Sequence, residues 1–130
     1  MITEVKCEDI QDKIITYFPE FKLSQSPFQK AIVYKLDDVI GFIVYSIMYE
    51  RAEIDYIAVD ERYRGKGISQ KLFDYLLLNL KCESISLEVN SNNKRAIGFY
   101  VKNGFKEVSV RKNYYKDSDG ILMVKKLEVK

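Results

Sequence analysis

Three stretches of the chain carry apolar residues at helical spacing. The clearest is Ile68–Leu80, where apolar side chains recur every fourth residue. A second apolar stripe covers Glu8–Phe18 and ends before Pro19. The third predicted helix is Asn92–Asn103, which Gly104 would close in a left-handed cap.

Other stretches alternate apolar and polar residues, which is typical of strands. In Ser84–Val89 three apolar side chains point one way, and Ser86 and Glu88 point the other. Asp37–Asp38 predicts a hairpin turn, whereas the Ser and Pro residues of Pro19–Pro27 predict a loop or a short helix. The predicted strands are Ala31–Lys35, Val39–Tyr49, Ala52–Val59, Ser84–Val89, Phe105–Tyr114 and Gly120–Leu127.

This order of elements predicts a mixed α/β fold in one domain, residues 1–130. Strands on either side of a helix would pair in parallel and hairpin strands antiparallel, so the sheet would be mixed, with helices packed on it. The strand Ala52–Val59 is irregular, because Ile57 and Val59 are as apolar as the residues in the opposite phase. A β-bulge and burial of both strand faces explain this equally well.

Composition mainly excludes functions. The 130 residues are 47% hydrophobic and 31% charged, as in a folded protein, and the net charge of +2 argues against a nucleic-acid-binding module. The absence of histidine excludes Ser-His-Asp and Cys-His catalysis and histidine-bearing zinc sites. Cys7 and Cys82 fit no metal spacing and are expected to be free thiols, so we predict no metal site.

The sequence also bears on location. Its first residues lack the basic and apolar parts of a signal peptide, and the longest apolar run, Tyr75–Leu78, is far too short to cross a bilayer. We therefore expect a cytoplasmic protein without a membrane partner. The oligomeric state is left open.

A basic loop with two glycines joins the strand that ends at Val59 to the helix that begins at Ile68. Backbone N–H groups at a helix N-terminus carry partial positive charge, and glycine lets an anion approach them. The loop therefore favours phosphate binding, with an ordinary basic surface loop as the alternative. Gly65-Lys66-Gly67 has neither the P-loop spacing nor the third glycine of a dinucleotide fingerprint.

This loop resembles the pyrophosphate loop of the GNAT N-acetyltransferases, which reads Arg/Gln-x-x-Gly-x-Gly/Ala after a strand. One match starts at Arg62, and another covers Arg64–Ser69, with Ser69 at the last small position. The second is favoured because the family places Val-Asp-x-x-Tyr directly before the motif, as Val59–Tyr63 does here.

From Ala52 onward the chain also resembles one branch of this family, the bacterial ribosomal-protein alanine N-acetyltransferases (RimI type). The segments that carry the likeness are Ala52–Val59, Leu87–Asn93, Ala96–Tyr100, Asn103–Phe105 and Arg111–Tyr115, together with Met123. In that branch, residues between the first helix and the hairpin help to hold the substrate peptide. The corresponding segment here, Tyr17–Phe28, does not clearly follow the branch pattern.

The resemblance implies a GNAT fold with a splayed strand pair at the acetyl-CoA site, and direct attack of an amine on the thioester. Acetyl-CoA would be the co-substrate. The residues implied in binding it are Ile57, Ala58, Val59, Arg64, Gly65, Lys66, Gly67, Ile68, Ser69, Gln70 and Asn93. For Asn93 a helix-capping role is the alternative.

The resemblance further implies that Glu88 is the general base, that Tyr100 is the general acid, and that Tyr114 and Tyr115 cover the acceptor. Judged alone, Glu88 would be a solvated carboxylate, Tyr100 a core aromatic, and the other two strand-end aromatics. The implied acceptor is a protein N-terminal α-amine, the alanine of the eighteenth small-subunit ribosomal protein. A small-molecule amine (a polyamine or an antibiotic) and a coenzyme A-binding regulatory module without turnover are the alternatives.

Overall fold

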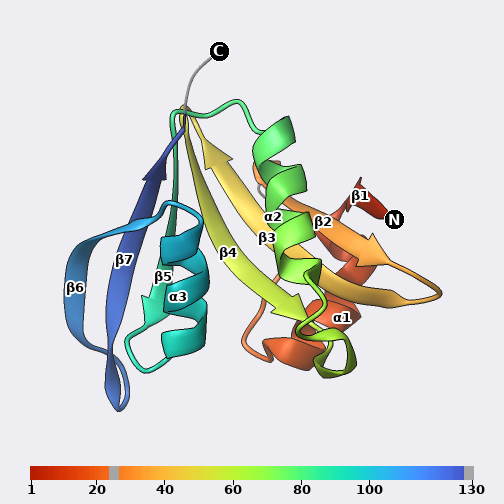
Figure 1. The fold of residues 1–130 in the computed structure, drawn as a ribbon. Coiled ribbons are helices and arrows are strands. Elements are labelled where there is room, and N and C mark those ends of the chain that lie inside the picture. Colours follow the sequence, from red (N-terminus) through yellow and green to blue (C-terminus); the bar gives the residue numbers. More distant parts are fainter. Residues whose placement is uncertain (24–26, 128–130) are drawn as a thin grey trace. The chain divides into compact units, whose positions relative to one another are not determined.

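The computed structural model describes residues 1–23 and 27–127 and has a mixed α/β fold (Figure 1). The strands are β1 Ile2–Val5, β2 Gln29–Lys35, β3 Val39–Met48, β4 Arg51–Val59, β5 Ser84–Asn90, β6 Lys106–Tyr115 and β7 Ser118–Lys126. The helices are α1 Gln11–Tyr17, α2 Ile68–Asn79 and α3 Lys94–Lys102, with 3-10 turns η1 Cys7–Ile10 and η2 Glu61–Tyr63. The strand order is β1-β2-β3-β4-β5-β7-β6, mostly antiparallel, with β4 and β5 parallel. The predicted fold class is thus confirmed.

The predicted helices and strands are all present with small shifts at their ends, but one strand was missed and one predicted helix needs correction. Strand β1 was not predicted, because four residues with only two apolar ones are too short for a period to show. The predicted helix Glu8–Phe18 is divided into η1 and α1, so its first turn is 3-10. Pro19–Leu23 forms no helix, while Ser24 and Ser26 of the predicted loop lie outside the described residues.

The chain divides into two compact units. Unit 1 is residues 1–47 and 55–80, and unit 2 is residues 48–54 and 81 onward. Strand β4 contributes its first half to unit 2 and its second half to unit 1. Each unit is therefore described separately.

Unit 1 buries apolar residues on both faces of its strands. One face packs against η1 and α1, and its buried residues are Cys7, Ile10, Ile14, Phe21, Ala31, Val33, Phe42 and Val44. On the other face α2 approaches β3 closely at Gly41, where a Cβ atom would lie 3.2 Å from Ile68 Cγ2 and from Leu72 Cδ1. Glycine at this position therefore sets how closely the helix after the basic loop can pack on the sheet.

Unit 2 is built around β5. Its buried residues Ile85, Leu87 and Val89 alternate with half-buried ones, as the sequence predicts. β5 pairs with β7 along all seven of its residues, and β7 pairs with the edge strand β6. The parallel ladder to β4 is short, Arg51–Glu53 with Ser84–Ser86. In residues 1–23 and 27–127, no helix is long and apolar enough to cross a membrane.

Candidate active site

The basic loop of unit 1 is shaped by two left-handed glycines. Gly65 and Gly67 both have φ +77°, and Gly67 is the N-cap of α2. Apart from the adjacent residues of the chain, no heavy atom of the described residues lies within 4 Å of where a Cβ would stand at either position, so the backbone is open on that side. Because the first N–H groups of a helix have no intrahelical partner, α2 presents donors next to this open backbone.

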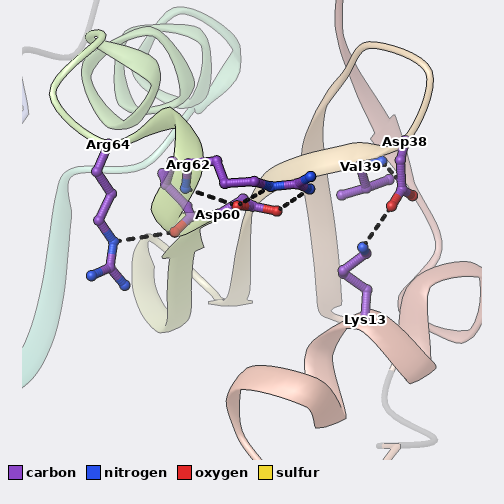
Figure 2. A network of polar contacts seen from close by, with 7 residues as sticks. Lys13, Asp38, Val39, Asp60, Arg62 and Arg64 are labelled. Atoms are coloured by element: carbon purple, nitrogen blue, oxygen red, sulfur yellow. Dashed lines mark hydrogen bonds and ion pairs between the residues drawn. The ribbon is translucent and has the colours of Figure 1, made fainter.

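The two arginines of the loop have different partners (Figure 2). Arg62 donates to both carboxylate oxygens of Asp60, from Nε at 3.1 Å and from Nη2 at 2.9 Å. Hydrogen bonding from Arg62 lowers the pKa of Asp60 to about 2. Arg64 turns back to the end of β4, where its Nε lies 3.4 Å from the Val59 carbonyl oxygen. Arg62 is thus engaged within the turn, which favours the motif match that starts at Arg64.

Strand β4 loses its alternation where the sequence predicted irregularity. Ala52 and Ile54 are buried, but the next four residues are all half-buried and Val59 is buried again. The change begins at Asp55, whose Oδ2 accepts hydrogen bonds from Gln29 and from Ser46. A polar side chain on this strand therefore has partners on β2 and β3. The bulge proposed for Ile57–Val59 stays a prediction.

In unit 2, Glu88 lies at the centre of a polar cluster. Its side chain is 17% exposed, and Arg111 Nε lies 3.0 Å from its Oε1. This ion pair is not aligned as a hydrogen bond, and no donor in the described residues satisfies the buried Oε1. Hydrogen bonding to Glu88 raises the pKa of Tyr114, and the Arg111 guanidinium lies 5.4 Å from the centre of the Tyr114 ring. Glu88 is thus a largely buried carboxylate with a cation and a phenol beside it, and the solvated-face alternative does not describe it.

Arg111 is the residue of this cluster that the sequence analysis did not assign. It belongs to the run Arg111–Tyr115 that carries the branch resemblance, but nothing local in the sequence pairs it with Glu88. The pairing arises because both residues flank β7, where Glu88 is opposite Leu122 and Arg111 is opposite Gly120.

Tyr100 is 6% exposed and packs edge-on against Phe105, with ring centres 5.5 Å apart. Burial raises its pKa to about 12. The phenol therefore keeps its proton across the neutral range, as a general acid must. Tyr100 is also a core aromatic, the alternative role that the sequence allowed for it.

Two further predicted residues have observed structural contacts. Asn93 caps α3, because its Oδ1 accepts a hydrogen bond of 3.1 Å from the Ala96 N–H. Tyr115 packs edge-on against Tyr114 with ring centres 5.0 Å apart, and burial raises its pKa. Asn93 thus has the capping role, and a coenzyme contact for it stays a prediction.

The predicted residues fall into two groups. Ile57–Val59 and Arg64–Gln70 belong to unit 1, whereas Glu88, Asn93, Tyr100, Tyr114 and Tyr115 belong to unit 2. Among the described residues, no three Cys, Asp or Glu side chains gather in a way that could hold a metal ion.

Known proteins resemble this chain in sequence and in fold. The chain is 33% identical over 83 residues to the [ribosomal protein bS18]-alanine N-acetyltransferase of Escherichia coli strain K12, covering 62% of this chain and 56% of that protein. The chain thus spans little more than half the length of that relative. The crystal structure of the ribosomal-protein-S18-alanine N-acetyltransferase from Escherichia coli has the same fold, with a TM-score of 0.86 at 23% identity, over 100% of this chain and 95% of that one.

Other acetyltransferases also match, one of them named for a different substrate. The spermine/spermidine N(1)-acetyltransferase of Bacillus subtilis is 34% identical over 85 residues, 56% of each protein. A GNAT family acetyltransferase from Elizabethkingia anophelis, solved with acetyl-CoA bound, has a TM-score of 0.76 at 20% identity, over 98% of this chain and 97% of that one. The sequence profile of the acetyltransferase (GNAT) family matches residues 4–105, most of the chain. The chain therefore belongs to the GNAT acetyltransferase family.

Proposed function

We propose that this chain, as one domain of residues 1–130, transfers the acetyl group of acetyl-CoA to the N-terminal α-amine of a protein. The observation that carries the proposal is Glu88, a largely buried carboxylate whose Oε1 has no hydrogen-bond donor among the described residues. A carboxylate oxygen that accepts no hydrogen bond can accept the proton that an attacking amine must lose.

The coenzyme side of the reaction is assigned to unit 1. The backbone beside Gly65 and Gly67 is open, and the N–H groups of the first turn of α2 suit the two negative charges of a pyrophosphate. Arg64 and Lys66 add positive charge to this loop. Ile57–Val59 would hydrogen-bond the pantetheine arm, and a backbone N–H near Val59 would polarise the thioester carbonyl.

The proton transfers are assigned to unit 2. Glu88 takes the proton of the amine, through water, as the amine attacks the thioester carbon. Tyr100 gives a proton to the departing thiolate, and Tyr114 and Tyr115 cover the acceptor. An α-amine suits this mechanism because its pKa of about 7.7–8.0 leaves roughly a tenth of it unprotonated at neutral pH, whereas a lysine amine with a pKa near 10.4 is almost fully protonated.

The acceptor proposed is the N-terminal alanine of the eighteenth small-subunit ribosomal protein. It is supported by the Escherichia coli relative named for bS18-alanine acetylation and by the run Arg111–Tyr115. A small amine is the second candidate, because a relative named for spermine and spermidine matches at similar identity.

A substrate panel tests both candidates. Purified protein with acetyl-CoA is offered an alanine-starting ribosomal peptide, the same peptide with a blocked N-terminus, and spermidine, and thiol release is followed. We expect turnover with the free peptide alone. Turnover with spermidine alone would show that the acceptor is a small amine and not a protein N-terminus. Acetyl-CoA binding without any turnover would indicate a regulatory module.

Mass spectrometry of the intact ribosomal protein, coexpressed with and without this chain, gives the decisive measurement for the acceptor. We expect a mass gain of one acetyl group at its N-terminus. No gain would remove this acceptor and leave the broader amine acetyltransferase.

A further inference from the structure

We propose that Asn113, Asp119 and Gly120 are positioning residues that hold Tyr114 beside Glu88, and so set the acceptor affinity of this enzyme. The proposal rests on the function proposed above and adds residues that neither contact the reacting atoms nor belong to the predicted site. It is carried by an irregularity of the β6–β7 hairpin, which lies entirely within unit 2.

The hairpin contains a large bulge in β6. Arg111 is paired with Gly120, and the next pair along the ladder is Tyr115 with Ser118. Lys112, Asn113 and Tyr114 therefore lie opposite a single residue of β7, Asp119. A regular ladder would place one residue there, so the direction of Tyr114 is set by the bulge rather than by strand alternation.

Asp119 and Asn113 fix the shape of this bulge. Asn113 has φ +54°, a left-handed conformation that asparagine tolerates better than most residues. Its N–H donates to Asp119 Oδ1 at 2.9 Å, and this bond lowers the pKa of Asp119. Asp119 is itself anchored to the end of β5, because its N–H donates to Ser91 Oγ and its carbonyl oxygen accepts from the Ser91 N–H.

Gly120 makes room for the Tyr114 side chain. A Cβ at Gly120 would lie 2.9 Å from Tyr114 Cδ2, closer than such atoms approach, and a tight 3.1 Å from its Cβ and Cγ. The ring therefore lies directly over the backbone of β7, and any larger residue at position 120 must displace it. Gly120 does not need a left-handed conformation, so its small size is what matters here.

The position of Tyr114 determines what surrounds Glu88. Arg111 links the two residues: its guanidinium lies over the Tyr114 ring, and its Nε lies 3.0 Å from Glu88 Oε1. Hydrogen bonding to Glu88 raises the pKa of Tyr114, and half of the tyrosine is exposed. An acceptor that reaches Glu88 would pack on this exposed aromatic surface. Displacing Tyr114 should therefore weaken acceptor binding and leave acetyl-CoA binding unchanged.

The kinetic test compares Gly120→Ala with Gly98→Ala, a glycine of α3 with open space at its Cβ position. We expect Gly120→Ala to raise the acceptor KM about tenfold, as loss of one well-placed contact does, with the KM for acetyl-CoA unchanged. In a Tyr114→Ala background, Gly120→Ala should have no further effect, because its action passes through Tyr114. An equal effect in both backgrounds would overturn the proposal.

Conservative variants separate positioning from general destabilisation. Asp119→Asn keeps an oxygen that can accept the Asn113 N–H, and Asn113→Gly keeps the left-handed backbone, so both should retain most of the acceptor affinity. Asp119→Ala removes the acceptor atom and should behave like Gly120→Ala. Equal loss in Asp119→Asn and Asp119→Ala would contradict the assigned contact.

A readout without turnover keeps this proposal distinct from the proposed function. In protein labelled with ¹³C at tyrosine Cζ, the Tyr114 signal, assigned with Tyr114→Phe, should titrate above the ordinary tyrosine pKa. The pKa of Tyr114 should fall towards its ordinary value in Glu88→Gln, Gly120→Ala and Asp119→Ala, but not in Gly98→Ala. If the substrate panel shows no turnover and these shifts are found, the function fails while the positioning stands. Unchanged titration in Gly120→Ala would overturn the positioning.

Discussion

At the scale of single residues, Glu88 is largely buried, yet one of its carboxylate oxygens accepts no hydrogen bond. Burying a polar group without a hydrogen-bond partner lowers the free energy of unfolding by about 1–3 kcal/mol. Such a cost is common at sites where an oxygen must stay available to a substrate. The nearby Arg111 compensates the charge without aligning a hydrogen bond to that oxygen.

Glu88→Gln should lower the acetylation rate at neutral pH about 10²–10⁴-fold, the usual contribution of a general base. The rate should partly recover as pH rises, because more of the amine is then unprotonated. Steady-state rates between pH 6 and about 9 check this, with the exposed Glu107→Gln on β6 as the matched control. A wild-type rate at every pH would remove Glu88 from the mechanism.

Tyr100 predicts a pH dependence of stability. Its pKa is about 12 in the folded chain, above the ordinary value near 10. Between these values the unfolded chain loses the proton while the folded chain keeps it, so stability falls as pH rises through this window and is fully present below it. The loss attributable to Tyr100 is about 2–3 kcal/mol across the window.

Denaturant unfolding of wild type and Tyr100→Phe at pH 8 to about 11 measures this difference. The variant should lose less stability with rising pH, whereas Tyr49→Phe, which replaces a side chain that is 97% exposed, should follow wild type. Parallel curves for wild type and Tyr100→Phe would contradict the burial of Tyr100.

At the scale of elements, the basic loop and the start of α2 form the proposed phosphate site. Gly67→Leu should weaken acetyl-CoA binding at least tenfold, because its side chain enters the open space beside the loop. The left-handed φ of Gly67 adds a stability cost of about 1–2 kcal/mol, which a melting curve would report. Calorimetric titration with acetyl-CoA checks the affinity, and an unchanged affinity would exclude the loop from the site.

Local pattern was sufficient for most elements. Ile68–Leu80 and Ser84–Val89 were predicted nearly to the residue because their periods are long and uninterrupted. The local pattern was insufficient for β1, which depends on pairing with β2. It was also insufficient for the bulge opposite Asp119, which depends on the register between two strands. The Glu88–Arg111 pair was missed for the same reason: strand order, and not spacing in the sequence, brings the two residues together.

At the scale of the whole molecule, β4 is common to both units. If the chain is one domain, the units should unfold together, because opening either one breaks the pairing of that strand. Hydrogen exchange measured by mass spectrometry at rising denaturant concentration should give one opening free energy for the slowest amides of β3 and of β5. Earlier opening of the β5 amides would show that the units unfold independently.

The bulge at Asn113 has a second consequence, for self-association. β6 is the last strand of the described sheet, it is exposed along its first nine residues, and it carries the apolar Val108 and Val110. A long regular edge of this kind is a template on which another chain can aggregate. In the bulge, three residues of β6 lie opposite one residue of β7, which interrupts the row of hydrogen-bonding groups along the edge. Arg111 and Lys112 add positive charge, which repels the same edge of another copy. The irregularity that places Tyr114 thus also protects the edge of the sheet, so straightening the bulge would cost the protein solubility as well as substrate affinity.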